Sequence, residues 1–318
     1  MSGHIVEWQA GNRKLYIRDL STMEDYREVE SIQVDAWGFN ELDVVPSGQL
    51  IAARWAGAIL LGAFEGESER MIGFVYGFPA LEAGHMSVHS HMLAVRPESR
   101  ALRAGIYLKL AQRIKAVELG LDEITWTFDP LQVLNANLNF ARLGVISHRY
   151  IVNFYGEETS SPLHRGLGTD RLWVRWLIST ERVKDRISLL SLESKDRQPA
   201  AEGTWTNSLS DPQPSLDRQG PLVLINSKSG WHQLSEPGHS AESSACLIEI
   251  PGDIGALKRT DLDLAERWRA RVQSAFLELF ASGFIAREFV SLASQQGARW
   301  FYLLKREGGS DADALGRE

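Results

Sequence analysis

The stretch from residue 87 to residue 128 constrains the fold more than any other part of the sequence. An apolar run at 87–95 is followed by an apolar-periodic segment at 102–119, and Gly120 separates that segment from a second apolar run at 123–128. A glycine just after a periodic segment is typical of a helix end, and short apolar runs between turn residues are typical of buried strands. The pattern predicts strand, helix and strand, the unit of an α/β fold.

The rest of the chain extends this plan into two domains. Further strands are expected at 15–20, 59–65, 71–78, 146–154 and 172–179, and further helices at 22–37 and 131–143. Domain boundaries are predicted from composition: an α/β domain with a mixed sheet over 1–189, a linker poor in large apolar residues over 190–220, a smaller C-terminal α/β domain over 221–306, and a disordered tail over 307–318. The C-terminal domain has strands at 222–226, 246–250, 284–292 and 300–305 and a helix at 263–282.

Composition narrows the class of protein. Hydrophobic residues make up 44% and charged residues 24%, which is ordinary for a soluble globular protein, and no apolar run is long enough to span a bilayer. The N-terminus lacks the apolar core of a secretory signal, and Cys246 alone cannot form an internal disulfide, so we expect a cytoplasmic protein. A net charge of -7 argues against broad nucleic-acid binding, although arginine clusters can still hold a small anion.

An anion site is predicted where the strand at 87–95 turns into the helix. Helix N-termini carry unpaired N–H groups and a partial positive charge, which suits a phosphate or pyrophosphate. Arg100 and Arg103 would add charge there, and Gly105 would let a ligand approach the backbone. From these residues alone, an ordinary junction with solvated arginines is an equal alternative.

The segment Val95-Arg-Pro-Glu-Ser-Arg-Ala-Leu-Arg-Ala-Gly-Ile106 resembles the acyl-CoA motif of the Gcn5-related N-acetyltransferase (GNAT) superfamily, V-x-P-x-x-[QR]-x-x-G-x-[GA]. Arg100 and Gly105 match this motif, and Arg103 stands where its first glycine is usual. The stretch ITWTFDPLQVLNANLNFARLGV resembles the superfamily's next strand and helix. The wider sequence, including the segments NFYG, DRLWVRW and ERWR, resembles a long bacterial subgroup of predicted GNAT acyltransferases.

This resemblance implies a GNAT fold with a mixed central sheet that splays between the strands at 87–95 and 123–129, plus a smaller, half-GNAT-like C-terminal domain. It also implies acetyl-CoA or another acyl-CoA, such as succinyl-CoA, as cosubstrate, and no metal. The pantetheine would pair with the first of these strands and the pyrophosphate would sit on residues 100–105. The implied cofactor-binding residues are Leu93, Ala94, Val95, Arg100, Arg103, Ala104, Gly105, Ile106 and Asn135.

Two histidines are the candidate bases. Strand alternation would place His85, Ser87, His89, His91, Leu93 and Val95 on one face. By the resemblance, His89 falls where histone-modifying members place a glutamate base, and His91 lies nearer the thioester. An imidazole with a pKa of about 6.5 suits an α-amine near 8 better than a lysine near 10.4, which favours an amino-acid acceptor. Core packing is the alternative role for both histidines, and a metal site with His85 is disfavoured because no further ligand is evident.

Other candidates surround the expected cleft. The family's usual proton donor, a tyrosine on the second helix, is replaced here by Phe140, so Tyr150, Tyr155 or a water would protonate the leaving thiolate. The candidate substrate-binding residues are Asp129 at a strand end, Asn139 on the following helix and Arg171, whose guanidinium suits a carboxylate.

We therefore expect an acyl-CoA-dependent N-acyltransferase. It would move an acetyl or succinyl group to a small-molecule amine, with an amino acid preferred, by direct attack on the thioester. A noncatalytic acyl-CoA-binding regulatory module, suggested by Phe140 and Arg103, and a protein N-acetyltransferase both stay open as alternatives. The expected partners include neither nucleic acid nor membrane, and a homo-oligomer is left open.

Overall fold

The computed structural model describes residues 3–66, 68–156, 166–196, 223–227, 230–233, 244–294 and 297–306, with side chains omitted at 191–196, 223–233 and 293–297. The expected tail at 307–318 and most of the expected linker at 190–220 lie outside the described residues. Helix α5 (Glu181–Asp196) covers the first positions of that linker, so the helix runs past the predicted boundary at residue 189.

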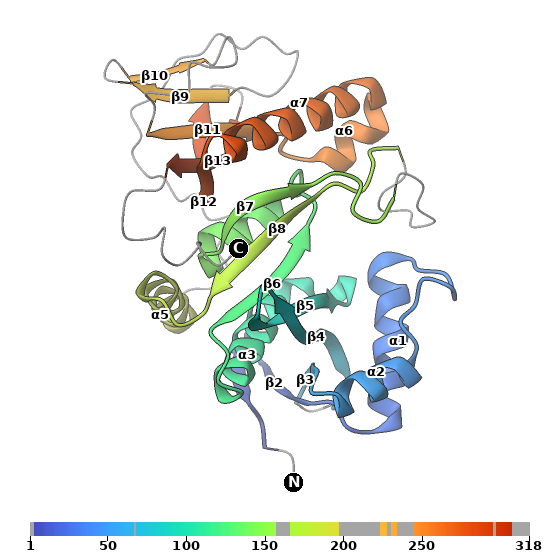
Figure 1. The fold of residues 1–318 in the computed structure, drawn as a ribbon. Coiled ribbons are helices and arrows are strands. Elements are labelled where there is room, and N and C mark those ends of the chain that lie inside the picture. The colour runs from blue at the N-terminus through green and yellow to red at the C-terminus, as the bar shows by residue number, and fades with distance from the viewer. Residues whose placement is uncertain are drawn as a thin grey trace.

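The N-terminal half contains the predicted elements and others that the sequence pattern missed (Figure 1). Its strands are β1 (Val6–Ala10), β2 (Arg13–Asp19), β3 (Ile59–Glu65), β4 (Met71–Glu82), β5 (His85–Val95), β6 (Glu123–Phe128), β7 (Ile146–Ile151) and β8 (Arg171–Leu177). Its helices are α1 (Met23–Trp37), α2 (Ser47–Trp55), the 3₁₀ helix η1 (Pro97–Leu102), α3 (Ala104–Glu118), α4 (Val133–Ala136) with its π-helical continuation η2 (Asn137–Leu143), and α5. Strand β1 and helices α2 and α5 are among the elements that were not predicted.

The C-terminal half adds five strands and two helices to the described chain. They are β9 (Val223–Ser227), β10 (Gly230–Gln233), β11 (Ala245–Ile250), α6 (Ile254–Thr260), α7 (Leu262–Ala281), β12 (Phe284–Ser294) and β13 (Gly297–Arg306). Over the described residues the strands follow one another in the order β1-β2-β3-β4-β5-β6-β8-β7-β12-β13-β11-β9-β10. The two halves therefore meet edge to edge, where Ala286 on β12 pairs antiparallel with Ser147 on β7.

The two halves are related by an internal pseudo-symmetry. The chain order β6, α4–η2, β7, β8 gives the spatial order β6-β8-β7, and the chain order β11, α7, β12, β13 gives the matching spatial order β11-β13-β12. The β7–β12 junction lies at the centre, and each helix contacts the junction strand of the other half, α7 on β7 and η2 on β12. The N-terminal part of this correspondence is residues 123–177.

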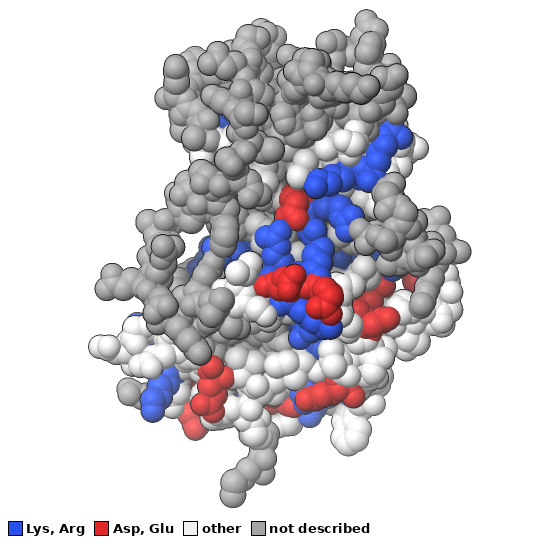
Figure 2. Space-filling model, turned by 90° about the vertical axis from the view of Figure 1, so that its left-hand side faces the viewer, with Lys and Arg blue, Asp and Glu red and all other residues white. Residues whose placement is uncertain are grey.

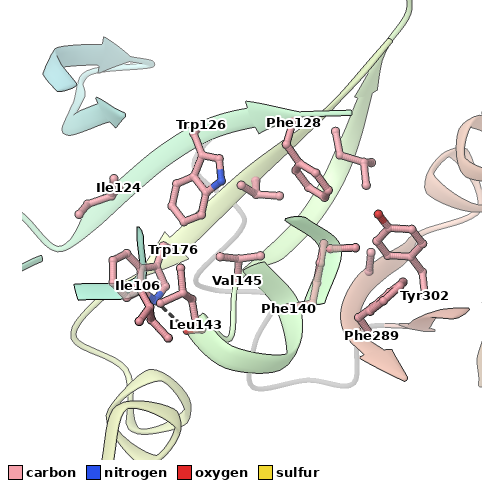
Figure 3. Packing of buried hydrophobic residues seen from close by; sticks show 14 of the residues in the cluster. Ile106, Ile124, Trp126, Phe128, Phe140, Leu143, Val145, Trp176, Phe289 and Tyr302 are labelled. Atoms are coloured by element: carbon pink, nitrogen blue, oxygen red, sulfur yellow. Dashed lines mark hydrogen bonds between the residues drawn. The ribbon is translucent and has the colours of Figure 1, made fainter. Parts of the chain in front are cut away.

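Two apolar layers hold the sheet. The smaller layer packs α1 and α2 on one face of β2 to β5, and includes Met92 and Ala94. The larger layer lies under α3 and continues across the junction into the C-terminal half, from Ile106 and Trp126 to Phe140 and Tyr302 (Figure 3). Because the halves share this core, α7, β12 and β13 help to position the end of β6.

Candidate functional site

The sheet is split between β5 and β6. These parallel neighbours pair only at Val88 with Ile124 and at His89 with Thr125, although β5 continues to Val95 and β6 to Phe128. Beyond His89 the two strands separate, while β5 stays paired with β4 and β6 with β8. Alternate N–H and C=O groups on an unpaired strand edge can bind an extended ligand. The split expected between these two strands is therefore present.

A β-bulge marks the apex of the split. Tyr76 pairs with Met92 but the next residue, Gly77, pairs with Ser90, so His91 is an extra residue in β5. A bulge moves the side chains that follow it to the other face of the sheet. The prediction that His85 through Val95 share one face is consequently wrong beyond residue 90: Leu93 and Val95 pack under α3, and Met92 and Ala94 pack under α1.

The turn from β5 into α3 has the geometry of an anion seat. Arg103 adopts φ 61° and ψ 16°, the left-handed conformation that glycine favours, at the position where the resembled motif has a glycine. Ala104 and Gly105 are the first residues of α3, so their N–H groups have no acceptor within the helix. Arg100 is exposed at the end of the 3₁₀ helix. Ala104 and Ile106 themselves are buried in the core, so only their backbone can face a ligand.

A third arginine of this turn has a structural role that the sequence did not reveal. Arg96 is buried, and its guanidinium forms ion pairs with Glu28 and Asp35 on α1. Its Nε donates to the Met71 carbonyl, 3.1 Å away. Arg96 thus connects α1 to the start of the turn, whereas Arg100 is exposed.

The two candidate bases lie together on either side of Phe78. The ring centroids of His89 and His91 are 5.5 and 5.7 Å from that of Phe78. His89 is stacked on Trp173 at 4.9 Å, and its Nδ1 lies 3.0 Å from Thr125 Oγ1. Burial, with the nearby charges of His91 and Lys109, lowers the pKa of His89 to about 4, whereas His91 is exposed and desolvation lowers its pKa less. Of the two histidines, only His91 is exposed.

A buried lysine at the apex was missed by sequence reasoning. Lys109 on α3 donates to Ser90 Oγ at 2.7 Å and to Gln112 Oε1 at 3.3 Å, and its Nζ lies 3.7 Å from the centroid of Trp126. Ser90 and Trp126 follow the last paired residues of β5 and β6, so Lys109 closes the narrow end of the split. Desolvation lowers its pKa well below the usual range. The helical spacing Gly105, Lys109, Gln112 could have indicated this face.

The expected proton donors do not reach the split. Phe140 is fully buried, with its ring against Phe128 and Tyr302 (Figure 3). Tyr150 is also buried, and its hydroxyl donates to Asp170 Oδ2 at 2.7 Å. Desolvation raises the pKa of Tyr150. Tyr150 therefore belongs to a structural contact rather than to the apex, whereas Tyr155 is about half exposed in the turn after β7.

The substrate-binding candidates separate into two places. Asp129 and Arg171 lie in a buried polar cluster with Asp170 and Arg269, the last from α7. Arg269 Nη1 lies 2.8 Å from Asp129 Oδ1 and, although burial opposes it, keeps the pKa of that carboxyl below its usual range. Arg171 donates to the Asp170 carbonyl at 2.9 Å and lies over Tyr155.

The two asparagines on the helix after β6 do not act as a pair. Asn139 is buried, and its backbone carbonyl oxygen accepts from Val145 N–H at 3.1 Å. Asn135 is exposed on α4. Because their surroundings differ, they present no common polar face to a ligand.

No group of three or more His, Cys, Asp and Glu side chains that could hold a metal ion occurs among the described residues. His85 lies 3.2 Å from Asp122 and 3.5 Å from Glu123 instead of joining the other histidines. Within the part of the chain that the structure describes, no helix is long and apolar enough to cross a membrane. On the face in Figure 2, basic and acidic side chains lie beside one another.

Comparisons with known proteins give likenesses in structure. No family model matches the sequence, and no curated protein matches it. The ribosomal-protein-S18-alanine N-acetyltransferase from Escherichia coli is 14% identical with a TM-score of 0.42, over 52% of this chain and 95% of that one. A putative acetyltransferase from Acinetobacter baylyi is 16% identical with a TM-score of 0.43, over 54% and 97%. Arabidopsis thaliana Naa50, bound to the bisubstrate analogue CoA-Ac-MVNAL, is 14% identical with a TM-score of 0.40, over 51% and 96%.

The architecture of this chain itself defines its fold. A mixed sheet is split between two parallel central strands, a bulge lies at the apex of the split, and the first strand turns directly into a helix that covers one face. The C-terminal half adds a second α/β unit to the sheet. The resemblance seen in the sequence is thus confirmed in the structure: the N-terminal half has the GNAT fold.

Proposed function

We propose that this protein is an acyl-CoA-dependent N-acyltransferase that transfers an acetyl group, or a larger acyl group such as succinyl, to the amine of a small molecule. The separation of β5 from β6 beside the turn into α3 carries the proposal. The free edge of β5 can bind an extended ligand, and it leads directly to the N-terminus of α3, which can bind an anion. An acyl-CoA needs both, because an amide-bearing pantetheine arm connects its thioester to a pyrophosphate.

The seat for the cofactor is made mainly of backbone. The edge of β5 from Leu93 to Val95 would pair with the pantetheine amides, since β6 no longer occupies it. The N–H groups of Ala104 and Gly105, with the charges of Arg100 and Arg103, would bind the pyrophosphate. A Cβ at Gly105 would contact Leu93 and Val95 at 3.5 and 3.9 Å, so the glycine also keeps the backbone of α3 close to this edge.

His91 is the proposed base. Its neutral imidazole would take the proton that the amine loses on attacking the thioester carbonyl. It lies on the bulge at the apex, and its exposure leaves it open to an acceptor. His89 is stacked on Trp173 and bonded to Thr125, so we assign it to holding the bulge in place. The low pKa of an imidazole favours an α-amine acceptor, such as that of a free amino acid, over a lysine side chain.

Lys109 is the proposed proton donor in place of the absent tyrosine. When the C–S bond breaks, the thiolate would take a proton from the Lys109 ammonium through the Ser90 hydroxyl, 2.7 Å from Nζ. Lys109 would recover that proton from solvent. Desolvation lowers the pKa of Lys109, so its ammonium gives up a proton more readily than that of an exposed lysine.

The test is release of free thiol from acetyl-CoA and from succinyl-CoA, each with a panel of D- and L-amino acids, simple amines and short peptides. Release that depends on a free amino acid supports the proposal and identifies both reactants. Release only with peptides would replace the small-molecule acceptor by a protein N-terminus. Binding of acyl-CoA without release across the panel would favour a noncatalytic module.

A further inference from the structure

A small pocket lies where the two halves of the chain meet, apart from the split between β5 and β6. It is lined by the end of β6, the loop before β8 and helices α6 and α7, and its polar and apolar walls include Asp129, Gln132, Leu167, Lys258 and Arg269. Since a strand rises about 3.3 Å per residue, the four steps from Thr125 to Asp129 span about 13 Å. The pocket is therefore remote from the apex where acyl transfer is proposed.

Arg269 is a buried cation with an unused donor in this pocket. Its side chain is only 9% exposed. Nη1 forms an ion pair with Asp129 Oδ1 at 2.8 Å, whereas Nε has no acceptor among the described residues. A buried donor without an acceptor is costly, so such a group indicates a missing partner.

The neighbouring carboxylates cannot supply that partner. Asp170 Oδ2 accepts from the Tyr150 hydroxyl at 2.7 Å and from Gln273 Nε2 at 2.9 Å, and Oδ1 accepts from Asn153 N–H at 3.0 Å. Asp129 Oδ1 already accepts from Leu131 N–H at 3.0 Å. Both carboxylates are therefore committed to holding their own segments of backbone and side chain.

The charge on the pocket walls selects a monoanion. Arg269 and Lys258 contribute two positive charges and Asp129 one negative charge, which leaves one positive charge unmatched. The side chain of Lys258 forms no hydrogen bond or ion pair with the described residues. A monocarboxylate would balance the remaining positive charge, whereas a phosphate dianion would carry excess charge beside Asp129.

From these observations we propose that the pocket is a binding site for a small monocarboxylate. One carboxylate oxygen would accept from Arg269 Nε and the other from Lys258, while Leu167 and Ile254 would contact a short apolar chain. Because Asp129 belongs to the N-terminal half and Arg269 and Lys258 to the C-terminal half, the ligand would join α6 and α7 to the end of β6. The site is independent of the proposed acyl transfer.

The experiment measures acetate binding to the full chain by ligand-observed NMR, without acyl-CoA, at fixed ionic strength and pH 7. Lys258→Met removes one proposed contact from a partly exposed position and leaves the Asp129–Arg269 pair in place, so it should fold. Arg259→Met, at the next position on α6 and outside the pocket lining, is the matched control.

We expect acetate to bind the wild type and the Arg259→Met control equally, and Lys258→Met about fivefold more weakly or worse, since a partly exposed charge-assisted contact is lost. Inorganic phosphate should not displace acetate. Equal acetate affinity in all three proteins, displacement by equimolar phosphate, or no acetate binding at all would each overturn the proposal. None of these outcomes depends on whether the protein transfers acyl groups.

Discussion

Replacing Lys109 by methionine tests whether the lysine at the apex of the split is desolvated as the structure indicates. Methionine has a similar length but no charge, and it would leave Ser90 Oγ and Gln112 Oε1 without the donor that Nζ provides. That loss costs about 1–3 kcal/mol for each buried group and does not change with pH. The pH dependence of the stability difference therefore isolates the charge of Lys109.

The direction of this pH dependence follows from the protonation of Lys109 in the unfolded and folded states. In the unfolded chain a lysine has a pKa of about 10.4, and burial lowers the pKa of Lys109 in the folded protein. Between these two pKa values the unfolded state binds one more proton, so the wild type gains stability as pH rises. The free energy of unfolding of the wild type minus that of Lys109→Met should rise by about 1.4 kcal/mol per pH unit across this window.

The assay is urea unfolding at pH 7, 8 and 9, followed by tryptophan fluorescence. Lys115→Met on the same helix is the control. Lys115 is partly desolvated, but Asp19 raises its pKa above the usual value, so its stabilising charge is lost only above about pH 10.4. The free energy of unfolding of the wild type minus that of Lys115→Met should therefore not change over pH 7–9. A flat difference for Lys109→Met as well would refute the lowered pKa of Lys109. A full slope already at pH 7 would mean that folded Lys109 is neutral there, and would refute its role as the proton donor.

Three further variants probe other parts of the account. Arg100→Ala should weaken acetyl-CoA binding about tenfold by calorimetry, because a charge-assisted contact to the pyrophosphate is lost; unchanged affinity would contradict the proposed cofactor seat. His91→Ala should lower kcat about 100-fold or more with little change in acetyl-CoA affinity. The wild-type rate should fall with decreasing pH only below about 6.5, since the pKa of His91 is lowered; a normal rate for His91→Ala would exclude it as the base. Phe140→Tyr should lower the free energy of unfolding by about 1–3 kcal/mol in urea without raising kcat, because the new hydroxyl would be buried against Phe128 and Tyr302; a faster enzyme would mean that this position faces the thiolate.

Local sequence patterns predicted most of the elements, and the resemblance to the GNAT superfamily implied the position of the split. Apolar periodicity located β5, α3 and β6, and the motif around Arg100 and Gly105 located the turn between them. These features depend on contacts between residues close in sequence. The bulge at His91 could not be predicted, because a single inserted residue leaves the apolar pattern of the strand almost unchanged and only pairing with Tyr76 and Gly77 reveals it.

Roles that depend on distant contacts were not accessible from the sequence. Lysine usually lies at a solvated surface, and only the positions of Ser90 and Trp126 show that Lys109 is buried. Asp129 was predicted at the cleft from its place at a strand end, but its partner Arg269 lies far along the sequence, in the C-terminal half. The edge-to-edge junction of β7 and β12 likewise has no local sequence signal.

The most direct test of the central claim is hydrogen exchange of the wild-type protein with and without acetyl-CoA, read by mass spectrometry. If the cofactor lies between β5 and β6, exchange should slow in peptides that cover Ser90–Val95 and Arg103–Tyr107, because pantetheine and pyrophosphate would occupy those N–H groups. Peptides from β2 and β3, on the far side of the sheet, should not change. Slowed exchange elsewhere, with residues 90–107 unaffected at saturating acetyl-CoA, would contradict the account.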